Sequence, residues 1–221
     1  MYAICAAESS GELPYTTETG TERAGRWLVS PLVKKMSSDE EKQFTFRLNA
    51  VDRGATVDVE LGDARLTMER ELKSGEAQNY DALILDAFSS DSIPVHLLTK
   101  EAMELYEKHM NPEGVIAIHI SNRYLDLEPV VRGLARETNY PMVVVDSSSG
   151  EDYGEDWIYA CTWILLTRNE GIIKKLEEVG HDRTDLSQQE DFRVWTDDYT
   201  SISKIIDWPE WWPSWLGRDS H

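Results

Sequence analysis

Short apolar runs alternate with one-faced amphipathic segments along the chain from about residue 50 onward. The runs are typical of strands buried on both faces of a sheet, and the segments between them are typical of helices that cover it. Apolar runs predict strands at residues 56–61, 82–86, 114–120, 141–145 and 162–167. Amphipathic spacing predicts helices at residues 64–73, 100–110, 127–138 and 171–179. Strands that alternate with helices predict an α/β fold with a mostly parallel sheet flanked by helices.

Local signals mark the ends of two of these helices. Thr99 is the predicted N-cap of the helix at 100–110, and the run Asn111-Pro112-Glu113-Gly114 predicts its end. Pro129 predicts the first turn of the next helix. The first fifty residues are less regular. Residues 2–7 predict a strand, and the polar residues 16–25 are compatible with either a loop or disorder.

The charge of the chain restricts its partners. Its 221 residues include 22 basic and 41 acidic ones, which give a formal net charge of -19, and no Lys/Arg cluster interrupts this excess. Such a chain repels nucleic-acid backbones and anionic membranes, and it attracts cationic substrates such as polyamines. The length predicts one domain with a full core.

Other classes of site receive no support from the sequence. Cys5 and Cys161 imply neither a disulfide framework nor a zinc site. His96, His109 and His119 lack the spacing of metal ligands, so no metal is predicted. The sequence has neither the basic n-region of a signal peptide nor an apolar run long enough to cross a bilayer, so we expect a cytoplasmic protein.

Acidic residues follow two of the predicted strands. Asp86 ends one apolar run, Asp91 follows it after a Ser-rich turn, and Asp63 comes after the strand at 56–61. An Asp in such a place can simply cap the next turn. However, the ligand crevice of an open α/β sheet lies beyond the carboxyl ends of its strands. We therefore expect Asp63 and Asp86 to end adjacent strands and to open into one crevice.

Four blocks of sequence, taken in order, resemble the spermidine-synthase-like domains. They are GDARL at 62–66, YDALILDAFSSDSIPVHLLT at 80–99, HISNRYLDL at 119–127 and WTDDY at 195–199. The likeness covers about residues 30–200, and it is closest to the domains that many bacteria fuse behind a transporter-like membrane segment. The resemblance implies a class I methyltransferase-type Rossmann fold.

The resemblance also implies a co-substrate, S-adenosylmethionine or its decarboxylated form, and no permanently bound cofactor. Gly62, Asp63 and Ala64 would bind its nucleoside. The Asp63 carboxylate would accept a hydrogen bond from the adenine amino group, and the Ala64 backbone would line the base.

The remaining roles that the resemblance implies concern the amine. Asp86 would orient and deprotonate the attacking amine, because an ammonium has no lone pair with which to attack. Asp91 would hold the distal ammonium by a charge-assisted hydrogen bond. Asp198 and Tyr199 would close the far side of the substrate.

The N-terminal part departs from the pattern of the family. No G-x-G loop follows the first predicted strand, where Glu8-Ser9-Ser10-Gly11 is at best a remnant, and Leu28-Val29-Ser30-Pro31 lacks the ribose-binding acid. Four residues separate Asp86 from Asp91, a longer spacing than is usual in aminopropyltransferases. We divide the chain into a divergent or incomplete N-terminal segment at 1–30, a spermidine-synthase-like domain at 31–200 and a Trp-rich tail at 201–221.

Three functions remain open at this point. The first is an aminopropyltransferase of polyamine metabolism, with a small-molecule amine as acceptor. The second is a methyltransferase that uses the same nucleoside pocket, and the third is a non-catalytic nucleoside- or polyamine-binding domain. A homodimer is compatible with any of them, and a membrane would be involved only if a native transporter-like segment belongs to the protein.

Overall fold

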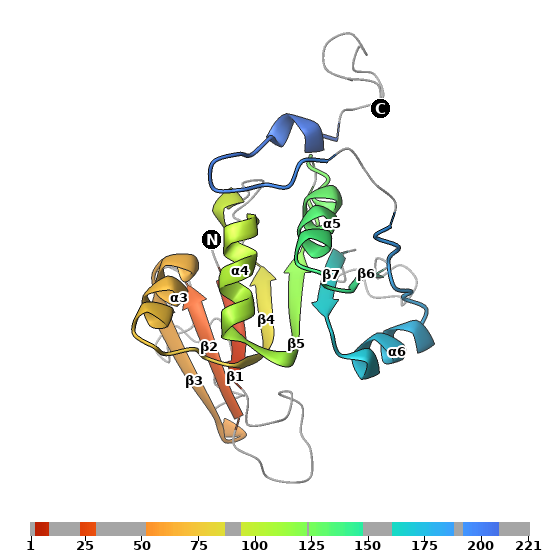
Figure 1. Ribbon diagram of the computed structural model, residues 1–221. Coiled ribbons are helices and arrows are strands. Elements are labelled where there is room, and N and C mark those ends of the chain that lie inside the picture. Colours follow the sequence, from red (N-terminus) through yellow and green to blue (C-terminus); the bar gives the residue numbers. More distant parts are fainter. Residues whose placement is uncertain are drawn as a thin grey trace.

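The computed structural model describes residues 3–8, 23–29, 52–86, 94–122, 124–147, 161–187 and 192–207. Its centre is a seven-stranded sheet of order β3-β2-β1-β4-β5-β7-β6 (Figure 1). The strands are β1 (Ala3–Glu8), β2 (Arg23–Val29), β3 (Ala55–Leu61), β4 (Tyr80–Asp86), β5 (Met110–His119), β6 (Met142–Ser147) and β7 (Cys161–Thr167). The helices are α3 (Ala64–Lys73), α4 (Lys100–His109), α5 (Glu128–Glu137) and α6 (Glu170–Glu178), with 3₁₀ turns η1 (Val95–Leu97) and η3 (Ile202–Ile205). The α/β class is therefore confirmed.

The sheet is mixed, which corrects the expectation of a mostly parallel sheet. β2 pairs in parallel with β3, and β4 with β5, whereas the other four neighbouring pairs are antiparallel. β1 runs opposite to both of its neighbours, and so does β7. β1 and β2, like β6 and β7, are consecutive along the chain, and consecutive neighbours join most simply as antiparallel pairs.

The direction of β1 bears on the predicted glycine-loop remnant. Ala3 at the start of β1 pairs with Asp86 at the end of β4, and Glu8 at the end of β1 pairs with Tyr80 at the start of β4. The chain therefore leaves β1 at the edge of the sheet opposite to Asp86. Glu8, the first residue of this remnant, is therefore the last residue of β1 at that far edge, and residues 9–11 lie outside the described residues.

Helices α3, α4 and α5 form one layer over the sheet (Figure 1). Their apolar faces completely bury Met68 of α3, Met103 of α4 and Leu134 of α5, and Trp195 from the C-terminal segment is buried with them. The segment 192–207, blue in Figure 1, lies beyond the end of the sheet toward which β4 and β5 point. Ligand crevices of α/β sheets lie at that end, so this segment borders the expected site.

Most predicted helices and strands are confirmed, with shifts of a few residues at their ends. The Thr99 hydroxyl caps α4 by accepting a hydrogen bond from the Ala102 amide at 3.2 Å. Pro129 lies in the first turn of α5.

α4 ends at His109, within one residue of the predicted end, but β5 begins four residues earlier than predicted. β5 begins at Met110, directly after the helix, so the run Asn111 to Gly114 lies in a strand. The pairing of β5 with β4 shifts between Tyr80–Met110 and Ala82–Val115, which leaves extra residues on β5. A Cβ atom at Gly114 would lie 2.8 Å from the Tyr80 carbonyl oxygen, so glycine is needed for this close passage rather than to stop a helix.

Two further expectations concern parts of the chain beyond this core. Within the described ranges, no helix combines the length and apolar character needed to span a bilayer. The Trp-rich stretch after Asp207 lies outside the described residues. The domain boundaries at residues 30 and 200 stay predictions.

Candidate functional site

The end of β4 meets the end of β5 at one edge of the sheet. These strands are parallel neighbours, and Leu85 pairs with Ile118, so the next residues, Asp86 and His119, lie side by side. His119 Nδ1 is 2.9 Å from Asp86 Oδ1. The Asp86 side chain is 53 % exposed and the His119 ring only 22 %, so the carboxylate keeps access to a ligand while the ring is held in place.

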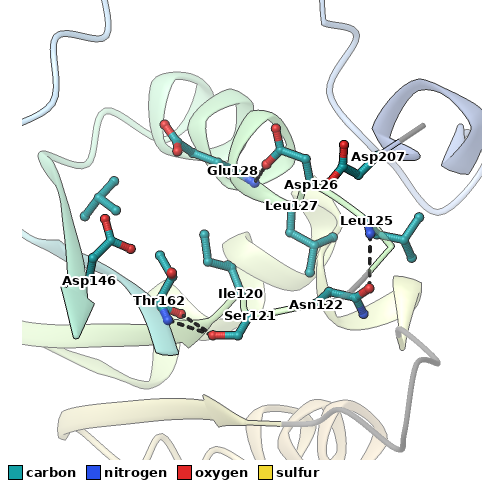
Figure 2. A pocket seen from close by; sticks show the side chains of 11 residues that line it. Ile120, Ser121, Asn122, Leu125, Asp126, Leu127, Glu128, Asp146, Thr162 and Asp207 are labelled. Carbon is teal, nitrogen blue, oxygen red and sulfur yellow. Dashed lines mark hydrogen bonds between the residues drawn. The ribbon is translucent and has the colours of Figure 1, made fainter. Parts of the chain in front are cut away.

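His119 is fixed on its other sides as well. Its Nε2 lies 2.9 Å from the Ser121 hydroxyl oxygen. Its ring stacks on Trp163 of β7, with 4.8 Å between ring centroids and 24° between the planes. The Thr162 amide donates a hydrogen bond to Ser121 Oγ at 2.6 Å, which Figure 2 shows from the side of the pocket. Residues from β4, β5 and β7 thus form one connected polar group.

A pocket of about 410 Å³ opens beside Ser121, between the ends of β5, β6 and β7 and the start of α5 (Figure 2). Among the described residues, its wall carries four carboxylates and no Lys, Arg or His. They belong to Asp126, Glu128, Asp146 and Asp207, and Glu128 is in an ion pair with Arg132 of α5. The C-terminal segment closes one side, where the Asp126 amide donates to the Ile205 carbonyl at 2.7 Å. A wall of this charge favours a cationic ligand.

Asp63 lies at a different point of the same edge, after β3. Its Oδ1 caps α3 by accepting a hydrogen bond from the Leu66 amide at 3.0 Å, and its Oδ2 is 2.9 Å from His96 Nε2. The expectation that Asp63 and Asp86 end adjacent strands is wrong, because β2 and β1 lie between β3 and β4. Three strand spacings separate β3 from β4, about 14 Å at roughly 4.8 Å each.

The neighbours of Asp63 in the GDA block have distinct structural roles. Gly62 has φ +154°, and a Cβ atom there would lie 3.4 Å from the Thr67 hydroxyl. The Ala64 side chain is buried in the core. The predicted contact of the Ala64 backbone with adenine stays a prediction.

Arg65 has several partners in this region, and its pairing with Asp197 was not predicted from the sequence. Its guanidinium binds Asp197 through two hydrogen bonds, of 2.7 and 2.5 Å, and it donates to the His96 carbonyl at 2.7 Å. The hydrogen bonds from Arg65 hold the pKa of Asp197 below its ordinary value. This ion pair ties the WTDDY block to the start of α3.

Asp198 and Tyr199, predicted to close the substrate site, lie in the turn that follows this ion pair. Asp198 is exposed. The Tyr199 ring is half-buried under the Arg193 guanidinium, 3.8 Å from its centroid, and its amide bonds to the Thr196 carbonyl. Asp91 lies in the stretch 87–93, outside the described residues. The substrate-binding roles of these three residues stay predictions.

Comparison with known proteins gives a distant similarity to the polyamine aminopropyltransferases and spermidine synthases. No family model matches the chain. A polyamine aminopropyltransferase of Vibrio vulnificus is 32% identical over 88 residues, which are 40% of this chain and 26% of that protein. The chain thus matches about a quarter of the length of this curated relative.

Two solved structures match parts of the chain at TM-scores below 0.5. A probable spermidine synthase from Corynebacterium glutamicum gives a TM-score of 0.37 at 17% identity, over 59% of this chain and 49% of that one. The spermidine synthase from Thermotoga maritima gives a TM-score of 0.43 at 12% identity, over 77% and 53%.

Proposed function

We propose that the chain is an aminopropyltransferase-like protein, which moves an aminopropyl group from decarboxylated S-adenosylmethionine to a diamine. One observation carries this proposal: the Asp86–His119 pair joins, through Ser121, a pocket whose wall, over the described residues, has four carboxylates and no basic residue. Carboxylates favour a cationic diamine. A proton-accepting group beside it meets the need of an ammonium to lose a proton before its nitrogen attacks.

The nucleoside would lie along the carboxyl edge of the sheet, between the ends of β3 and β4. Asp63 at one end of this span would accept the adenine amino group. The cap on α3 and the contact with His96 engage one oxygen each. A carboxylate offers about four acceptor positions, so capacity for a further donor remains. The likeness over 88 residues to a named polyamine aminopropyltransferase supports the proposed class of reaction.

A second candidate is a non-catalytic domain that binds a nucleoside or a polyamine. Two observations favour it. β2 ends at Leu28 and Val29 where the resemblance expects an acid for the ribose, and β1 leaves the sheet at the edge opposite to Asp86. Losing a charged contact to the ribose costs about 1.5–3 kcal/mol, or about 10- to 150-fold in affinity. We therefore expect weak binding of the nucleoside.

An assay of methylthioadenosine release separates these functions. The full chain is incubated with decarboxylated S-adenosylmethionine and with putrescine, cadaverine or spermidine in turn. Release of methylthioadenosine together with a lengthened polyamine supports aminopropyl transfer. Methyl transfer from S-adenosylmethionine without that release would make the protein a methyltransferase. If neither reaction occurs, the protein is best described as a non-catalytic binding domain.

A further inference from the structure

The contacts of His119 form one hydrogen-bonded chain, and its two ends fix its direction. The Thr162 amide can only donate, and the ionised Asp86 carboxylate can only accept. His119 Nδ1, 2.9 Å from Asp86 Oδ1, must therefore be the donor of that bond. In the neutral ring Nε2 is then an acceptor, and the Ser121 hydroxyl, at 2.9 Å, donates to it while receiving the Thr162 amide at 2.6 Å.

The same atoms can hold one proton more without losing a hydrogen bond. Ser121 Oγ lies 3.5 Å from the Thr162 carbonyl oxygen, so its hydrogen can turn from Nε2 to that carbonyl. A protonated Nε2 then donates to Ser121 Oγ. An imidazole has an ordinary pKa of about 6.5 and an Asp carboxyl one of about 3.9, so a ring is the stronger base of such a pair.

Ser121 is the member of this series of hydrogen bonds that reaches the pocket. Ser121 is part of the pocket wall, whereas the ring behind it is stacked on Trp163 and 22 % exposed. Among the described residues at this end of the strands next to β5 and β7, the titratable groups besides His119 are Asp86 of β4, Asp146 of β6 and Cys161 of β7. The other carboxylates of the pocket are those of Asp126, Glu128 and Asp207.

We propose that His119 is the base of the reaction, that Ser121 relays the proton to it, and that Asp86 is a positioning residue. This proposal rests on the proposed aminopropyl transfer. An ammonium in the pocket gives a proton to Ser121 Oγ as the Ser121 hydrogen moves to His119 Nε2, which leaves an imidazolium and a neutral amine. The amine lone pair then forms the new C–N bond. The C–S bond breaks with its electron pair on sulfur, so the sulfonium becomes neutral methylthioadenosine and the new amine carries the positive charge.

Kinetics of matched variants distinguish the two assignments of the base. His119→Gln keeps a donor for Asp86 but cannot take up a proton, so we expect kcat/KM for putrescine to fall by about 10²–10⁴. We also expect the pH profile of kcat/KM to differ from that of the wild type, because the variant has no imidazole at this position to take up the proton. For Ser121→Ala we expect a smaller fall in kcat/KM, of about tenfold, because a water molecule can replace the hydroxyl. If His119→Gln stays within a few-fold of the wild type with an unchanged pH profile, Asp86 is the base and the proposal is wrong.

A control variant and a test of folding show whether a loss of rate comes from the site or from loss of structure. His181→Gln, after α6, removes a histidine to which neither the site nor the proposal assigns a role, and it should leave the rate unchanged. Thermal unfolding of each variant checks that it is folded.

Nitrogen-15 NMR of the histidine-labelled protein tests the direction of these hydrogen bonds without any turnover. We expect the neutral His119 ring to carry its proton on Nδ1, and a proton on Nε2 would overturn the relay. An Nδ1-protonated ring in a protein that releases no methylthioadenosine would overturn the aminopropyl transfer, and with it the role of His119 as its base. An active protein whose His119→Gln variant is unimpaired would overturn only the assignment of the base.

Discussion

Two His–Asp pairs lie at the same edge of the sheet, and each has an N–O distance of 2.9 Å. The pairs differ in what else their members contact. Asp63 caps α3 with its second oxygen, and its partner His96 is the exposed residue of the turn η1. Asp86 ends a strand, and its partner His119 reaches Ser121 and the pocket through its second nitrogen. The same two residue types therefore secure a helix start in one place and connect to a ligand-sized space in the other.

The largest expected difference between the two pairs is in turnover. Asp86→Asn keeps the shape of the side chain but removes the charge that stabilises a protonated His119. We expect kcat for aminopropyl transfer to fall by about 10²–10⁴, whether the proton resides on the ring or on Asp86. The matched variant Asp63→Asn should change kcat much less. Steady-state rates of methylthioadenosine release measure both, and equal losses in kcat would contradict the division of roles.

The next effect concerns the ion pair that secures the Asp63 side. Asp197→Asn removes the charge of the closer of the two carboxylates that contact the Arg65 guanidinium, whose side chain is 11% exposed, and leaves Glu69 as the other. Asp197 itself is 43% exposed, so solvent screens part of the loss, and we expect the free energy of unfolding to fall by about 1–3 kcal/mol. Urea unfolding at neutral pH measures this value. The ligand-free Asp86 side should be unaffected, as judged by the NMR signal of His119.

The same ion pair makes the stability of the fold depend on pH, and the sign of this dependence follows from the lowered pKa of Asp197. A carboxyl group with a lower pKa in the folded state stabilises the protein fully above its ordinary value, about 3.9, and loses this contribution as the pH falls through the folded-state value. Wild-type stability should therefore decrease below about pH 4, and Asp197→Asn should decrease less steeply there. Parallel slopes for the two proteins on acidification would rule out this contribution.

A smaller effect separates the two uses of the Asp63 carboxylate. Asp63→Asn can still cap α3 but offers a weaker acceptor to adenine, so we expect the Kd for methylthioadenosine to rise by about tenfold, or 1.4 kcal/mol. Calorimetry of the two proteins measures the change. An unchanged Kd would place the adenine elsewhere.

The smallest effect is on the helix start alone. Asp63→Ala removes the cap as well, and its free energy of unfolding should lie about 1 kcal/mol below that of Asp63→Asn. Urea unfolding of both variants gives the difference. If the two are equally stable, the contact with Leu66 contributes nothing to the stability of α3.

The periodicity of the sequence predicted the helices and most strands, because each depends on residues that are near in the chain. Asp63 and Asp86 were placed at strand ends for the same reason. The His119–Asp86 contact depends on the register between β4 and β5, which no local pattern specifies. The direction of β1 within the sheet could not be predicted either, since an apolar strand has the same pattern in either direction. The Arg65–Asp197 pair joins residues 132 positions apart, and only the block GDARL marked Arg65 as worth attention.

In the proposed function, one nucleoside extends along the sheet edge from Asp63 to Asp86. An NMR titration of the labelled full chain with methylthioadenosine tests this placement. We expect the amide signals of residues 62–66 and those of Asp86 and His119 to shift together, with one common, weak Kd. Shifts at residues 62–66 without any at Asp86 and His119, or no shift at millimolar ligand, would contradict the claim.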